Sequence, residues 1–279
     1  MNKLTLGFSP CPNDCFIFDA LIHKKIDTEG VEFDVIMSDV EDLNKRAFSN
    51  TINITKLSYH AYMYLVNEYV LLDSGSALGF GCGPLLICKM DDGKWKMGSS
   101  LNKVAIPGKY TTANFLLSLA YPRIKNKLEM IFSEIENAVL SEKADAGVII
   151  HENRFTYEQK GLKKVIDLGQ YWETLTNHPI PLGGIVVQRS IDAEIQNKVN
   201  GLIKKSVEFA FANPKSSNEF VKANAHEMDE AVMYRHIELY VNKFSIELGL
   251  QGRQAVDTMF NKAIEIGLIN KPAKSIFIH

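Results

Sequence analysis

The sequence contains little cysteine and no excess of charge of one sign. Four cysteines occur in 279 residues, and 31 Lys and Arg nearly balance 33 Asp and Glu, for a net charge of −2. A disulfide framework is therefore not expected, and we predict that the cysteines are reduced. The lack of a basic surplus argues against nucleic acid as a partner.

Long apolar segments are absent as well. No stretch approaches the roughly 18–20 apolar residues that a membrane helix needs. The first residues lack the basic, apolar and small-residue segments of a signal peptide. We therefore predict a cytoplasmic protein with no membrane partner. Hydrophobic residues make up 46% of the chain, so it is expected to fold around a substantial core.

Signatures of metal and nucleotide sites are missing. The sequence has no Cys-x-x-Cys or His-Glu-x-x-His motif for zinc, and Cys11 and Cys15 have no third cysteine nearby for an iron–sulfur cluster. The glycine-rich residues 75–83 are not followed by Gly-Lys-Ser/Thr, and no Gly-x-Ser-x-Gly nucleophile motif occurs. We therefore predict no metal and no redox cofactor, and serine hydrolase chemistry is disfavoured.

Strand-like and helical patterns alternate along the chain. An aromatic helix is expected over residues 59–68, and the chain after 192 is expected to be almost wholly helical. Strands are expected at residues 4–8, 31–36, 52–54, 69–72, 84–88, 104–106, 128–132, 145–150, 164–168 and 185–187. This order predicts an α/β protein of two lobes, each a mostly parallel sheet flanked by helices. We assign residues 1–90 and 189–279 to the first lobe and residues 91–188 to the second.

Polar residues follow several predicted strands, which is where open α/β sheets bind ligands. These residues are Asn13, Lys56, Ser58, Thr111, Thr112 and His151. Helix N-termini at such positions offer unpaired N–H groups and a partial positive charge, so a small anionic ligand is predicted. Asparagine, serine and threonine are also common N-cap residues, and each could serve only to begin its helix.

Among the seven histidines, His151 is the candidate for catalysis. The ordinary pKa of histidine, about 6.5, allows the side chain to act as a general base near neutral pH. Its position just after a predicted strand would direct it toward a ligand. The structural alternative is a residue at the start of a helix with one ring nitrogen bonded to the backbone.

Ordered motifs extend over nearly the whole chain. They are Ser9-Pro-Cys-Pro-Asn-Asp14 with Phe16-Ile-Phe18, Asp39-Val-Glu41, Thr55-Lys-Leu-Ser-Tyr59, Gly75 to Pro84, Thr111-Thr112, Ile149-Ile-His-Glu152 with Arg154-Phe-Thr-Tyr157, Pro181-Leu-Gly183 and Tyr240-Val-Asn242. Together these motifs resemble those of the 1,4-dihydroxy-6-naphthoate synthase family. Cys15 is one departure, since threonine is expected at that place in the opening motif.

The resemblance implies a carbon–carbon lyase of the futalosine route to menaquinone. Such an enzyme converts cyclic dehypoxanthinyl futalosine, a small carboxylate, to 1,4-dihydroxy-6-naphthoate and releases a three-carbon fragment. The implied fold is that of the type II periplasmic binding proteins, and the implied proton acceptor is His151. The implied substrate-site residues are Lys56, Leu57 and Ser58, with Thr111 and Thr112 across a cleft.

Two other functions stay open. Chorismate dehydratase of the same pathway shares the lobed fold, although the motif around His151 favours the naphthoate synthase. A solute-binding protein with this fold would hold a small anion without converting it, because fold alone does not determine function. The missing signal peptide counts against that second reading.

Overall fold

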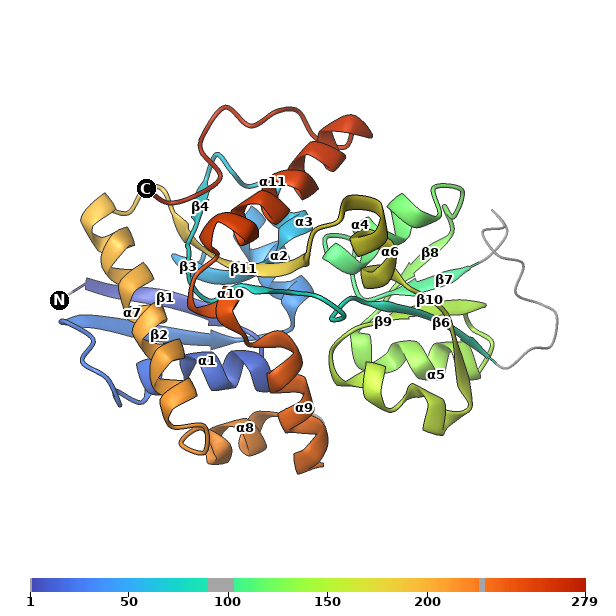
Figure 1. Cartoon of the computed structure of the whole chain (residues 1–279), viewed down its shortest axis with the longest axis horizontal. Helices are drawn as coiled ribbons and strands as arrows, with labels where there is room; N and C mark the ends of the chain where they lie inside the picture. The colour runs from blue at the N-terminus through green and yellow to red at the C-terminus, as the bar shows by residue number, and fades with distance from the viewer. Residues whose placement is uncertain (1, 90–102, 226–228) are drawn as a thin grey trace. The chain divides into compact units, whose positions relative to one another are not determined.

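The computed structural model describes residues 2–89, 103–225 and 229–279. The chain divides into two compact units, one formed by Met1–Gly79 with Pro181–His279 and one by Phe80–Ile180. Each unit has its own sheet flanked by helices (Figure 1). The predicted α/β class is thus confirmed. Within the described ranges, every helix is too short or too polar to span a membrane.

Unit 1 is built on a six-stranded sheet in the order β2-β1-β3-β11-β4, with β5 pairing to β11. Its strands are β1 (Asn2–Phe8), β2 (Val31–Met37), β3 (Ile54–Ser58), β4 (Tyr69–Leu71), β5 (Ala77–Gly79) and β11 (Ile180–Gln188). Its helices are α1 (Pro12–Ile22), α2 (Val40–Phe48), α3 (Tyr59–Tyr62), α7 (Ala193–Ala212), α8 (Asn218–Asn224), α9 (Glu230–Tyr240), α10 (Lys243–Ile246) and α11 (Gly249–Glu265). The predominance of helices after residue 192 is as predicted, and beyond α11 the chain returns to the sheet, where Phe277 bridges to Leu71.

Unit 2 is built on a five-stranded sheet in the order β10-β6-β9-β7-β8. Its strands are β6 (Leu85–Lys89), β7 (Val104–Ile106), β8 (Lys127–Glu129), β9 (Ala146–Ile149) and β10 (Leu162–Asp167). Its helices are α4 (Thr112–Ala120), α5 (Ile135–Leu140) and α6 (Leu168–Thr176), with the 3₁₀ segments η1 (Phe132–Glu134), η2 (His151–Phe155) and η3 (Tyr157–Lys160).

Both sheets are mixed, whereas mostly parallel sheets were expected. In unit 1, β1 runs parallel to β2 and β3, but β11 runs antiparallel to β3 and β4. In unit 2, β7 runs parallel to β8 and β9, but β6 runs antiparallel to β9 and β10. β6 is the first strand after the division at Gly79 and β11 begins at the division at Ile180, so the strand that runs against its neighbours in each sheet is the one beside a division between the units.

The division between the units falls after Gly79 and after Ile180, earlier than the expected crossings near residues 90 and 188. Pairing explains the difference, since β6 joins the sheet of unit 2 and β11 joins the sheet of unit 1. The boundary expected near residue 90 was based on the polar, glycine-containing residues 89–100. Almost all of these lie outside the described residues.

The predicted helix over residues 59–68 is also shorter in the structure, because α3 ends at Tyr62 and turns follow. After α3 the backbone N–H groups of Tyr64 and Leu65 donate to carbonyls three residues back rather than four, so the segment continues as turns. Arg189, directly after β11, holds the end of this segment: its Nε donates to the carbonyl of Val66 and its backbone N–H to the carbonyl of Glu68, each over 2.8 Å. Arg189 is 123 residues from Val66 in sequence, so local periodicity could not reveal these contacts.

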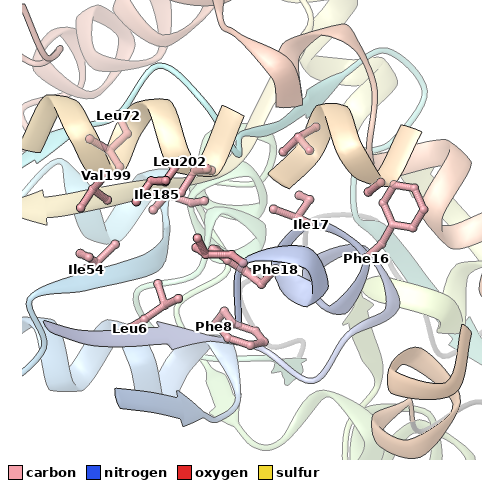
Figure 2. Close-up of a cluster of buried hydrophobic side chains, with 14 of the residues drawn as sticks. Leu6, Phe8, Phe16, Ile17, Phe18, Ile54, Leu72, Ile185, Val199 and Leu202 are labelled. Carbon is pink, nitrogen blue, oxygen red and sulfur yellow. The ribbon is translucent and has the colours of Figure 1, made fainter. Parts of the chain in front are cut away.

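The core of unit 1 lies between its sheet and the helices α1 and α7 (Figure 2). Leu6 and Phe8 of β1 face Phe18 of α1, and the rings of Phe8 and Phe18 stack at 4.5 Å. Ile185 of β11 and Leu202 of α7 continue the same cluster. Burial of α1 on nearly every side explains its lack of a polar face.

Unit 2 contains one very close backbone approach. A Cβ added to Gly83 would lie 2.2 Å from the Cα of Gly169. We expect Gly83→Ala to destabilise the protein by about 1–3 kcal/mol, because backbone must move to admit the methyl group. Gly201→Ala is the matched control, since its Cβ in α7 meets nothing within 4 Å, and it should stabilise by about 0.4–1 kcal/mol. Urea unfolding of both variants measures the difference, and equal midpoints would contradict it.

Candidate functional site

Polar side chains gather where β1 and β3 end in unit 1. These neighbouring strands are parallel, so their carboxyl ends meet at one edge of the sheet. The segment after β1 leads through Ser9 into α1, and β3 leads directly into α3. The sequence placed Asn13, Lys56 and Ser58 at these junctions, and the structure puts all three in unit 1 with buried side chains.

A buried ion pair joins the two junctions. Lys56 Nζ lies 3.1 Å from Asp14 Oδ1, with side-chain exposures of only 6% and 2%. Lys56 Nζ also donates to the carbonyl of Gly75 over 2.9 Å. The other oxygen of Asp14 accepts from the backbone N–H and the hydroxyl of Ser9, over 3.1 and 2.7 Å. A lysine has three donors, so these two contacts leave a third that could reach a ligand.

Asn13 extends this network to α9. Its Nδ2 donates to Asp14 Oδ1 over 2.8 Å, and its Oδ1 lies 2.8 Å from Nε2 of His236, which is fully buried. Because the Asn13 amide nitrogen donates toward Asp14, its oxygen accepts, and His236 therefore carries a proton on Nε2. The alternative prediction, that Asn13 serves as the N-cap of its helix, is wrong, since Cys11 is the N-cap of α1. One amide N–H of Asn13 remains for a ligand.

Ser58 is held by a second network. Its backbone N–H donates to Asn44 Oδ1 over 3.0 Å, and its hydroxyl oxygen accepts from Asn44 Nδ2 over 3.2 Å. The same Nδ2 donates to Glu41 over 3.0 Å. Ser58 is the N-cap of α3 by position, but its side chain makes no capping hydrogen bond. The hydroxyl proton can therefore be directed to a ligand.

Leu57 lies between these polar residues and is fully buried. Side chains alternate along a strand, so Leu57 points to the opposite face of the sheet from Lys56 and Ser58. Its backbone pairs with Gly184 of β11. Any contact of Leu57 with a ligand on the Lys56 side would have to come from its backbone.

Thr111 and Thr112 begin α4 in unit 2 and are both buried. The Thr111 hydroxyl accepts from the backbone N–H of Asn114 over 3.3 Å and donates to the carbonyl of Gly108 over 2.8 Å. Thr111 is thus the N-cap of α4, which was the alternative prediction for this residue. Thr112 is the first residue of the helix, and its side chain is not the cap.

Lys127 of β8 forms two hydrogen bonds with side chains of α4. Its Nζ donates to Asn114 Oδ1 over 2.7 Å and to the Ser118 hydroxyl over 2.6 Å.

Desolvation, aided by nearby Lys125, lowers the pKa of Lys127 to about 8. Between pH 8 and the unfolded pKa, the unfolded chain binds more protons, so this group makes stability rise with pH. We expect wild type to gain stability relative to Lys127→Met from pH 7.5 to 9.5 in urea unfolding, and a constant difference would contradict this.

His151 follows β9 in unit 2 and is partly exposed at the start of η2. Its backbone lies in the left-handed region, with φ of 58°. Such a conformation is uncommon for a non-glycine residue, histidine being one of the types that adopt it more often, and it occurs in turns and at functional sites. Its ring packs edge-on against Phe132 at 4.8 Å. The structural alternative placed His151 at the start of a helix, and the structure has the short 3₁₀ segment η2 there.

Cys15 of the opening motif is a poor nucleophile. Cys11 and Cys15 are both buried, and neither takes part in a disulfide. Burial, and next the charge of Asp14, raise the pKa of the Cys15 thiol far above its usual range. A thiol held in its protonated form is unreactive. Among the residues the structure describes, no three His, Cys, Asp or Glu side chains are grouped to hold a metal.

Sequence analysis missed Asp14, Asn44 and His236 as members of these networks. Lys56 carried the one available signal, because a lysine in a buried strand such as β3 needs an anionic partner. Which anion it meets depends on the pairing of β1 with β3. His236 lies 223 residues from its partner Asn13, and helical periodicity alone places it only as a buried residue.

Comparisons with known proteins agree over the whole chain. The profile of the family described as menaquinone biosynthesis matches residues 4–265. A protein named 1,4-dihydroxy-6-naphthoate synthase from Thermus thermophilus is 40% identical over 278 residues, covering 100% of both chains. One with the same name from Streptomyces coelicolor is 38% identical over 273 residues, covering 96% of this chain and 95% of the relative.

Solved structures share the architecture. A crystal structure of a protein from Archaeoglobus fulgidus has a TM-score of 0.89 at 33% identity, covering 96% of this chain and 98% of that one. The alkanesulfonate-binding protein from Xanthomonas axonopodis has a TM-score of 0.69 at 12% identity, covering 97% and 95%. The chain therefore has a periplasmic-binding-protein-like fold, and the second similarity concerns the fold alone.

Proposed function

The chain belongs to the menaquinone biosynthesis family, and we propose that within it the protein is a carbon–carbon lyase. Its proposed reaction converts cyclic dehypoxanthinyl futalosine to 1,4-dihydroxy-6-naphthoate. The observation that carries the proposal is the full-length 40% identity to a protein named for this product. The proposed site lies in the cytoplasm and uses neither a metal nor a redox cofactor.

In the proposed mechanism, His151 removes a proton from the bound substrate. The electrons of that C–H bond then open the carbocycle, the three-carbon fragment leaves, and aromatisation of the product drives the step. A histidine suits this task because its ordinary pKa, about 6.5, leaves most of the imidazole neutral near physiological pH. The position of His151 after β9 and its left-handed backbone support the assignment.

The substrate carboxylate is proposed to be held by hydrogen-bond donors at strand ends. Lys56, Asn13 and Ser58 each retain a donor after their internal contacts are counted. Thr112, at the N-terminus of α4, is proposed as a further substrate-binding residue. Such contacts would fix the orientation of the reacting bond relative to the base.

The proposal is tested by incubating purified protein with cyclic dehypoxanthinyl futalosine and following naphthoate by absorbance and mass. Product that still forms with a chelator present is the expected result. Conversion of chorismate instead would identify the dehydratase of the same pathway. Binding of either compound without turnover would identify a solute-binding protein.

Thr112→Ala tests the carboxylate contact. We expect the variant to raise KM about 10- to 100-fold with a smaller change in kcat, since a hydrogen bond to a charged group contributes about 1.5–3 kcal/mol. Thr258→Ala is the control, because that hydroxyl donates to the carbonyl of Gln254 within its own helix, α11. Steady-state kinetics decide the question, and an unchanged KM would argue against this contact.

A further inference from the structure

The turn that carries His151 is tied to the rest of unit 2 at two places. Asn153 Nδ2 donates to Glu136 Oε2 on α5 over 2.7 Å. Arg154 donates to the carbonyl of Gly83 over 2.5 Å and lies 3.3 Å from Asp167. Both anchors lie within three residues of His151, so they fix the backbone on its C-terminal side.

The first anchor is costly to keep. The Glu136 side chain is only 2% exposed, and burying a carboxylate is unfavourable unless it is well paired. One of its oxygens accepts from Asn153 and from Lys160, the latter over 2.6 Å. In the part of the chain that the structure describes, the other oxygen has no hydrogen-bond partner. A half-satisfied buried carboxylate lowers stability, which points to a use other than packing.

The left-handed backbone of His151 indicates what Glu136 is needed for. A left-handed conformation is strained for a non-glycine residue, and it persists only where the surroundings hold it. Glu136 receives Asn153 two residues after His151, and Phe132 contacts the imidazole from the segment before α5. The segment 132–136 therefore controls both the backbone after His151 and the placement of its ring.

We infer that Glu136 and Asn153 are positioning residues for His151. They act through the conformation of η2, and neither is assigned a contact with substrate. This inference rests on the proposed role of His151 as the base. A purely structural role would lower the stability of unit 2 without moving the imidazole relative to Phe132.

The test reverses the donor and acceptor of the anchor. Asn153→Asp places two carboxylates together and should release the turn. The double variant Asn153→Asp/Glu136→Gln restores a hydrogen bond, since the new amide donates to the new carboxylate. Asn153→Ala removes the donor without adding charge and serves if Asn153→Asp does not fold. Ser141→Ala is the control, because its hydroxyl bonds only to its own turn at the exposed end of α5.

Two readouts separate positioning from stability. In protein with isotope-labelled histidine, the His151 ring protons sense the ring current of Phe132, and the His151→Asn spectrum identifies them. We expect Asn153→Asp to move these signals toward those of free histidine and to lower kcat about 10- to 100-fold. The double variant should restore both while the other histidine signals stay in place throughout.

Unmoved His151 signals in a folded Asn153→Asp or Asn153→Ala protein would overturn the inference, as would a double variant that restores nothing. The proposed function fails on a different measurement, namely wild-type turnover by His151→Asn. The NMR shifts do not depend on activity, so the two failures are distinguishable.

Discussion

His151→Asn is expected to lower kcat by roughly 10²–10⁴-fold, the usual contribution of a general base. Asparagine is the preferred replacement because it tolerates the left-handed backbone found here, with φ of 58°. Alanine would add backbone strain to the loss of the imidazole. The asparagine variant therefore separates the chemical role of the side chain from its conformational role.

The measurement is single-turnover formation of naphthoate by the folded variant. Thermal unfolding within a few degrees of wild type is the condition for reading the rate. His178→Asn provides the control, since His178 also lies in unit 2 and follows a residue that is already left-handed, Asn177. Wild-type turnover by His151→Asn would remove His151 from the role of base.

Lys56→Met is expected to destabilise the protein by about 3–5 kcal/mol, because it leaves the buried carboxylate of Asp14 without its cation. The double variant Asp14→Asn/Lys56→Met should be less destabilised than Lys56→Met alone, since no unpaired charge remains. Lys3→Met is the control. Lys3 and Asp34 form a pair in the same unit, 3.5 Å apart, with exposures of 63% and 62%, and its loss should change stability by less than about 1 kcal/mol.

Urea unfolding of the three variants gives these differences. If Lys56→Met is as stable as Lys3→Met, the Asp14–Lys56 pair does not stabilise the fold. If the double variant is no better than Lys56→Met alone, the loss comes from packing of the lysine stem. Loss of substrate affinity in the double variant would add support for Lys56 as a ligand donor.

Local pattern was enough to predict most of the elements and the α/β class. The strand at 4–8 and the helices after residue 192 follow from period-two and helical spacing within the segments themselves. The turns after α3 could not be predicted, since the segment is held at Val66 by Arg189, 123 residues away in sequence. The mixed character of the sheets depends likewise on where β6 and β11 insert.

The candidate site was predictable at the level of position. Strand ends directed attention to Lys56, Ser58, Thr111 and His151, and each lies at such an end or at the helix start beyond it. The contacts themselves were not predictable. Asp14 meets Lys56 only because β1 and β3 are neighbours, and the backbone of His151 is set by tertiary anchors rather than by its sequence neighbours.

The place of β11 in the sheet has a consequence for synthesis of the chain on the ribosome. This strand lies between β3 and β4, so the sheet of unit 1 is incomplete until Gln188 has emerged. Unit 2 spans only Phe80–Ile180, and all five of its strands emerge earlier. We therefore expect unit 2 to fold first. Until β11 has emerged, residues 1–79 cannot complete their sheet, and their apolar strands stay exposed for chaperones to bind.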